Sequence, residues 1–126
     1  MSNSNLLILA ACGVLDIKKP VEVRMNTKAP KGTDSMAGYC MPRYRKGKVI
    51  RHMIHINLRV CVESSYSLDD VVLHEICHAA QFEHGIFDWG KHHDKKFRKL
   101  CKVLEIEMPK LGYAVGKLFN SKTDKT

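Results

Sequence analysis

Residues 67–85 read SLDDVVLHEICHAAQFEHG, and this stretch decides the fold that we expect. Ser67 stands before an apolar run and Asp70 follows three residues later, a spacing that resembles the capping box at the start of a helix. Gly85 is typical of the residue that ends a helix, because glycine adopts the left-handed backbone conformation without steric cost. The sequence therefore predicts a long helix over residues 68–83.

His74, Glu75 and His78 give this helix the pattern H-E-x-x-H. Residues four apart lie one turn apart on the same helix face, so both imidazoles can reach one metal ion, and the glutamate can act as general base on a metal-bound water. On a helical wheel all three side chains lie on the buried side, whereas Cys77 lies off the ligand side and is expected in the core. The pattern favours one Zn²⁺ ion. The alternative is a buried His–Glu hydrogen-bond cluster without a metal.

A catalytic zinc needs a third protein ligand and an open position for water, and the spacing leaves two candidates for that ligand. His84 would complete H-E-x-x-H-x-x-x-x-x-H, but that geometry needs a turn after His78, and Gln81 stands where glycine would make it. If the helix continues, His84 lies about 120° round from His78 and does not reach the metal. His93 becomes the ligand if residues 85–90 turn the chain back.

The segments around this helix predict a small α+β domain. Apolar and polar residues alternate over residues 50–59, which indicates a strand with one buried and one wet face. His52 falls on the buried face and is expected to be a core residue, and His55 falls on the wet face. The other expected elements are a helix over 5–15, strands over 21–25 and 36–44, a loop over 26–35, a hairpin turn at 46–48, and a helix over 94–105 that ends before Pro109.

The length of 126 residues fits one domain, and the formal charge of +8 makes a polyanion a candidate partner. The charge is uneven along the chain. Residues 18–59 carry a net charge of +9, residues 60–90 carry −6, and residues 91–126 carry +6. Two basic flanks thus surround an acidic centre that contains the H-E-x-x-H pattern. The alternative is ordinary solubilising charge.

The five cysteines argue against a disulfide framework and against a cysteine-type zinc ribbon, because their number is odd and no C-x-x-C pair occurs. We therefore expect a cytoplasmic protein with no membrane span, with association with the nucleoid or a viral origin as further options. One N-terminal feature favours a different compartment. Residues 9–13, LAACG, resemble the cleavage box of a bacterial lipoprotein with Cys12 as the lipidated residue, although the apolar run before it is short for a signal peptide.

Four stretches carry a resemblance to a known family: Met36-Ala37-Gly38-Tyr39, residues 54–58 (IHINL), residues 74–82 (HEICHAAQF) and residues 93–97 (HDKKF). Residues 36–100 resemble the SprT-like metalloprotease domain, the family that includes the Spartan proteases of DNA–protein crosslink repair. The resemblance implies an α+β, zincin-like fold of the minigluzincin type, in which a small, mostly antiparallel sheet packs on the active-site helix and a following helix. We expect this domain over residues 1–120 and a polar tail over 121–126.

In this family the third zinc ligand is a histidine followed four residues later by an aromatic residue, which maps onto His93 and Phe97, with His92 as an adjacent alternative. The chain departs from the family at Asp94, where glycine is usual, and it lacks the four-cysteine zinc ribbon that many members carry. The resemblance thus implies a minimal zinc endopeptidase, expected to be a monomer, in which His74, His78 and His93 bind zinc and Glu75 is the catalytic base.

Tyr39 and Tyr113 are candidates to stabilise the oxyanion, and a protein substrate is expected to add to the sheet as an extended strand. The basic flanks are expected to contact DNA phosphates without sequence preference. The candidate residues are Arg43, Arg45, Lys46, Lys48 and Arg51 near the hairpin, and Lys95, Lys96, Arg98, Lys99 and Lys102 on the second helix. Two other functions remain open: a non-enzymatic zinc-containing module associated with DNA, and a lipid-anchored zinc peptidase.

Overall fold

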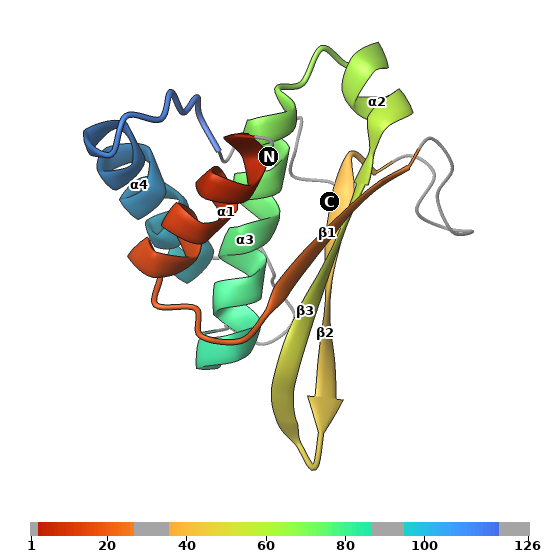
Figure 1. Ribbon diagram of the computed structural model, residues 1–126, viewed down its shortest axis with the longest axis vertical. Coiled ribbons are helices and arrows are strands. Elements are labelled where there is room, and N and C mark those ends of the chain that lie inside the picture. Colours follow the sequence, from red (N-terminus) through yellow and green to blue (C-terminus); the bar gives the residue numbers. More distant parts are fainter. Residues whose placement is uncertain (1–2, 27–35, 87–94, 119–126) are drawn as a thin grey trace.

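The computed structural model describes residues 3–26, 36–86 and 95–118. These residues form a small α+β fold with a three-stranded sheet and four helices (Figure 1). The elements in chain order are α1 (Asn3–Val14), β1 (Val21–Asn26), β2 (Gly38–Arg45), β3 (Lys48–Asn57), α2 (Leu58–Glu63), α3 (Leu68–His84) and α4 (Lys95–Lys110).

Helix α3 lies at the centre of the molecule, with the sheet on one side and helices α1 and α4 on the other (Figure 1). Every residue from Val71 to Gln81 is consequently buried, so this part of the helix has no wet face. The predicted start and end are both confirmed. The Ser67 side chain accepts a hydrogen bond from the Asp70 N–H, and Gly85 caps the C-terminus in the left-handed conformation at φ +64°. The capped helix is thus the central support of the fold.

The sheet has the strand order β1-β3-β2, which leaves β1 and β2 at its edges. Strand β2 pairs with β3 antiparallel through a turn at Lys46 and Gly47, as the sequence predicts, and both turn residues have positive φ. Strand β1 pairs with β3 parallel, from Val21 opposite His52 to Asn26 opposite Asn57. The sheet is therefore mixed rather than mostly antiparallel. Local sequence does not reveal the parallel pairing, because its two strands are joined only through a distant connection.

At two element ends the difference from the sequence prediction has a clear physical reason. Strand β3 ends at Asn57, because the Asn57 side chain accepts a hydrogen bond from Val60 N–H and starts helix α2 where the alternation predicted more strand. Helix α4 continues to Lys110 instead of ending at residue 105, and it contains Pro109. Met108 is fully buried there, and a proline in the last turn disturbs few intrahelical hydrogen bonds. The expected loop over 26–35 lies almost entirely outside the described residues, as does Asp94.

The N-terminal helix is confirmed, and one side of it belongs to the core, whereas Leu6 and Leu9 are exposed. Leu7, Ala11 and Leu15 are buried, and α1 packs against both α3 and α4. Cys12 is half-buried, and its burial, with the charge of Glu83 as a smaller cause, raises the pKa of its thiol to about 11. None of the described helices is long and apolar enough to cross a membrane.

Candidate metal centre

Helix α3 places His74, Glu75 and His78 in the protein interior, with 1%, 0% and 4% of their surfaces exposed. The prediction that these three side chains share the buried side is confirmed, and Cys77 is in the core as expected. Three polar side chains in an interior position are costly unless they have partners. Their environment therefore decides what this cluster can do.

Both imidazole rings are held through the same nitrogen. His74 Nδ1 lies 2.7 Å from the backbone oxygen of Leu118, and His78 Nδ1 lies 2.8 Å from the side-chain oxygen of Gln81. A carbonyl oxygen only accepts hydrogen bonds, so each Nδ1 carries the proton and donates it. Nε2 is then the nitrogen through which each ring would ligate a metal.

The arrangement of the two rings fits a tetrahedral metal ion. A zinc–nitrogen bond of about 2.1 Å places the ion about 3.2 Å from the centre of each ligating ring, and a tetrahedral angle then separates the ring centres by about 5 Å. The centres of the His74 and His78 rings are 5.2 Å apart, and the ring planes are inclined by 74°. The donor set of two neutral imidazoles is also one that zinc prefers.

Phe97 of helix α4 closes one side of this cluster. Its ring stacks on His78 at 4.2 Å and meets the edge of His74 at 5.0 Å, and it is fully buried. The aromatic residue that the family resemblance singled out thus contacts both histidines. The start of α4 is thereby held next to the H-E-x-x-H pattern.

A C-terminal strap, residues 113–118, returns along α3 and supplies the partner of His74. The Gly116 N–H donates to the Asp70 carboxylate at 3.1 Å, and Leu118 is buried. A Cβ on Gly116 would lie 2.5 Å from an Asp70 carboxylate oxygen, so a larger residue here would force the Asp70 side chain to shift. The strap holds His74 in position, and no pattern in the sequence predicts it.

Glu75 lies on the side of α3 that faces the edge strand β2. Burial raises the pKa of the Cys40 thiol of β2, and the nearby charge of Glu75 raises it further. Gly38, two residues earlier, packs against Val71 of α3. Alternate strand residues face the same way, so Tyr39 between them faces away from α3. Its ring stacks on His55 at 4.7 Å on the opposite face of the sheet, so Tyr39 is not placed to stabilise an oxyanion at this centre.

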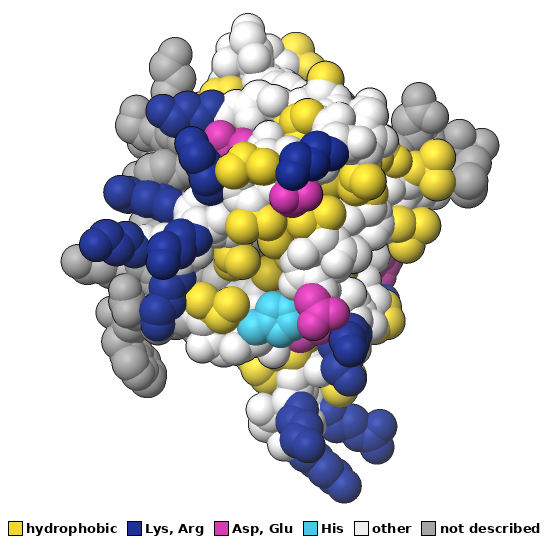
Figure 2. All heavy atoms as spheres, turned by 90° about the vertical axis from the view of Figure 1, so that its left-hand side faces the viewer, with side chains coloured by type: hydrophobic (Ala, Val, Ile, Leu, Met, Phe, Trp, Pro, Cys, Tyr) yellow, Lys and Arg dark blue, Asp and Glu magenta, His cyan; other side chains and the backbone are white. Residues whose placement is uncertain are grey.

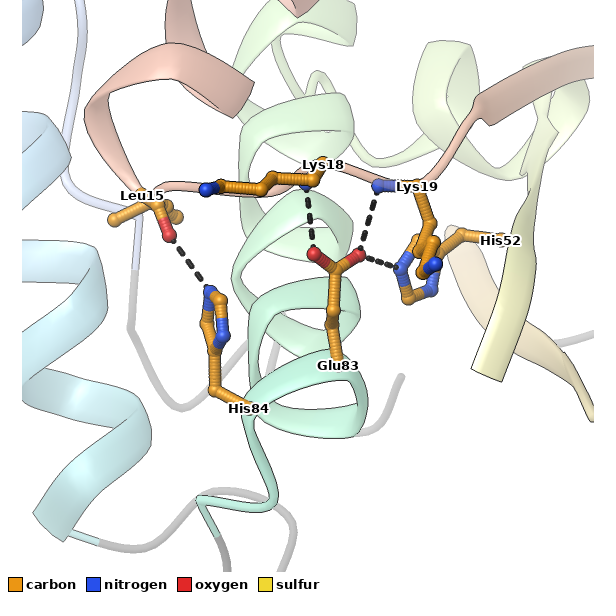
Figure 3. Close-up of polar contacts among 6 residues, drawn as sticks. All are labelled: Leu15, Lys18, Lys19, His52, Glu83 and His84. Carbon is orange, nitrogen blue, oxygen red and sulfur yellow. Dashed lines mark hydrogen bonds and ion pairs between the residues drawn. The ribbon is translucent and has the colours of Figure 1, made fainter. Parts of the chain in front are cut away.

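The alternative third ligand His84 lies outside the cluster. Helix α3 continues without a break to His84, and the His84 Nε2–H donates to the backbone oxygen of Leu15 at 3.0 Å (Figure 3). His92 and His93 lie outside the described residues. Within the three described ranges, no group of three or more His, Cys, Asp or Glu side chains could hold a metal ion. The role of His93 therefore stays a prediction.

Polar contacts of Glu83, which we call the Glu83 tether, fix the C-terminal end of α3, and no pattern in the sequence predicts them. The Glu83 carboxylate accepts hydrogen bonds from the backbone N–H groups of Lys18 and Lys19, at 2.7 and 3.2 Å, and lies 2.9 Å from His52 Nε2 (Figure 3). Burial opposes ionisation of Glu83, but these three hydrogen bonds outweigh it and hold the pKa of the carboxyl below its usual range. His52 is a buried core residue, as the alternation predicted.

The basic residues predicted to contact DNA are exposed. Figure 2 shows Lys and Arg side chains gathered along one edge of the face it views and again at its lower end, where the β2–β3 hairpin lies. Arg51 is engaged within the protein, since it pairs with Glu22 at 2.7 Å. The exposed residues of the two groups are Arg43, Arg45, Lys46, Lys48, Arg51, Lys95, Lys96, Arg98, Lys99 and Lys102.

Comparison with known protein families gives a match. A family model described as the SprT-like family matches residues 14–116, which run from the end of α1 into the C-terminal strap. The match covers far more than half of the 126-residue chain and includes α3 and the start of α4. No curated protein and no solved structure matches.

Proposed function

The chain belongs to the SprT-like family, and from that premise we propose that it is a zinc-dependent endopeptidase with a zincin-like fold. The observation that carries the proposal is the paired orientation of His74 and His78. Each ring donates through Nδ1, and the ring centres have the separation that a tetrahedral ion requires. In both rings Nε2 is then the nitrogen that would ligate the metal.

His93 completes the proposed ligand set. Phe97 contacts both histidine rings, and four residues of chain span at most about 14 Å, so residue 93 is within reach of the centre. Zinc held by His74, His78 and His93 would lower the pKa of a water molecule toward neutrality and would polarise the substrate carbonyl. Glu75 takes the proton of the attacking water and delivers it to the nitrogen of the leaving amine.

A peptide substrate is proposed to pair with the outer edge of β2. This strand is an edge of the sheet, it packs against α3, and its Cys40 lies close enough to Glu75 to be affected by its charge. Pro42 within β2 is typical of an edge strand, because proline lacks the N–H that an inner strand needs. Backbone pairing at this edge accepts many sequences, which suits a protease of broad specificity.

The decisive experiment combines zinc analysis with proteolysis by the wild-type chain and the Glu75→Gln variant. We expect one zinc per chain in both proteins, and cleavage of an unfolded protein that falls about 100- to 10,000-fold in Glu75→Gln, because general-base catalysis is lost. Glu83→Gln is the matched control on the same helix and should cleave normally. Full cleavage by Glu75→Gln would refute the assignment of Glu75, and absence of zinc from the wild-type chain would refute the metal centre.

The substrates are proposed to include proteins bound or crosslinked to DNA, on the strength of the two exposed basic groups. Binding of single-stranded DNA should weaken linearly on a log–log plot against salt concentration, and substitution of Lys95, Lys99 and Lys102 by glutamine should reduce the slope. Equal salt slopes for wild type and this triple variant would show that α4 does not contact DNA. DNA binding without proteolysis under any condition would instead favour the non-enzymatic DNA-associated module.

A further inference from the structure

Gln81 is a fully buried carboxamide within helix α3, one turn beyond His78. Burial of an amide is costly unless its atoms form hydrogen bonds. Both ends of the Gln81 amide form a hydrogen bond. The oxygen Oε1 lies 2.8 Å from His78 Nδ1, and the nitrogen Nε2 donates to the backbone oxygen of Ile86 at 3.3 Å. Gln81 therefore joins a proposed metal ligand to the chain just beyond the helix.

The orientation of the Gln81 amide follows from these partners. The Ile86 carbonyl only accepts hydrogen bonds, so the NH₂ end of the amide must face it, and the oxygen end must face His78. An amide oxygen in turn requires a proton on His78 Nδ1. The backbone oxygen of Gln81 also accepts from the Ile86 N–H at 3.0 Å, so Gln81 and Ile86 are joined through both backbone and side chain. The backbone at the end of α3 thus orients the amide, and the amide orients the histidine.

We propose that Gln81 is a positioning residue that sets both the proton location and the ring orientation of His78, and that it couples this ligand to the backbone of Ile86 at the end of α3. The inference rests on the proposed function insofar as His78 is a metal ligand. His74 is held by the backbone oxygen of Leu118, which no side-chain substitution removes directly. Substitution of Gln81 should therefore disturb one ligand and leave the other in place.

The test compares Gln81→Met with Gln81→Glu. Methionine keeps the length of the side chain but accepts no strong hydrogen bond, whereas glutamate keeps an acceptor for His78 Nδ1–H and, in its protonated form, a donor to the Ile86 carbonyl. Loss of an outer partner of a metal-bound histidine costs about 10- to 100-fold in metal affinity, so Gln81→Met should weaken zinc binding by that factor, and Gln81→Glu should stay within about threefold of wild type. Glu83→Gln is the control for a polar change at the same helix end and should bind zinc as wild type does.

The second measurement needs no metal. Long-range ¹H–¹⁵N correlation spectra of the metal-free proteins show which nitrogen of His78 carries the proton. We expect Nδ1 in wild type and in Gln81→Glu, and a shift of the proton toward Nε2 in Gln81→Met, while His74 stays protonated on Nδ1. Unchanged zinc affinity and an unchanged His78 proton in Gln81→Met would overturn the inference. If wild type binds no zinc, the proposed function fails, and the His78 proton still decides whether Gln81 positions the ring.

Discussion

Removal of the Glu83 carboxylate tests whether the tether in Figure 3 holds the end of α3. The Glu83→Ala variant loses the acceptor for two backbone N–H groups and for His52 Nε2. The Glu83 side chain is only 9% exposed and the His52 side chain is fully buried, so water does not readily replace the bond between them. Lys18 and Lys19 are exposed, and their N–H groups can turn to water.

The expected loss of stability follows from these exposures. The buried His52 nitrogen left without its acceptor costs about 1–3 kcal/mol, and the two exposed N–H groups add little once they are hydrated. We expect a total of about 2–3 kcal/mol. For a domain of this size each kcal/mol lowers the melting temperature by roughly 4 °C, so the midpoint should fall by about 10 °C.

Urea unfolding of wild type, Glu83→Ala, His52→Phe and the double variant measures this free energy and assigns it to the pair. A coupling energy above about 1 kcal/mol is expected between the two positions. Zinc affinity should stay at the wild-type value, because the tether touches neither His74 nor His78. A loss below about 0.5 kcal/mol in Glu83→Ala, or a coupling energy near zero, would refute the tether as a source of stability.

The remaining predictions concern pH, the ligands and the strap. The folded-state pKa of the Glu83 carboxyl is below its ordinary value of 4.5, so the ionised carboxylate stabilises the folded protein above pH 4.5, and this stabilisation is lost as the pH falls through the folded-state pKa. In unfolding curves measured at decreasing pH, the stability advantage of wild type over Glu83→Gln should therefore shrink. Metal analysis should show zinc loss in His93→Ala and not in His84→Ala, and the reverse result would move the third ligand to α3. Phe97→Ala should cost about 3–5 kcal/mol in urea unfolding, because it leaves a cavity against both histidines, and a cost under 1 kcal/mol would contradict its packing role. Gly116→Ala should lose the hydrogen bond to Asp70 and displace the strap that holds His74, so zinc binding measured by calorimetry should weaken. An unchanged zinc affinity would show that the strap does not position the His74 ring.

The sequence alone determined the elements that depend on neighbours in the chain. The Ser67 cap, the Gly85 stop and the one-turn spacing of His74 and His78 all follow from the backbone geometry of one helix. The turn at Lys46 and Gly47 follows from local conformational preference in the same way. The proposed ligands His74 and His78 and the proposed base Glu75 were therefore identifiable before any tertiary structure was known.

The tertiary structure alone decided which distant groups hold these residues in place. The acceptor of His74 lies 44 residues away at Leu118, and the donors to Glu83 lie 64 and 65 residues away. The parallel pairing of β1 with β3 and the placement of α3 between sheet and helices are likewise long-range. No sequence period marks such contacts, because they form only when packing closes long loops and brings the groups together. Local patterns thus identify the proposed metal ligands and the proposed base, and the packed fold sets their orientation.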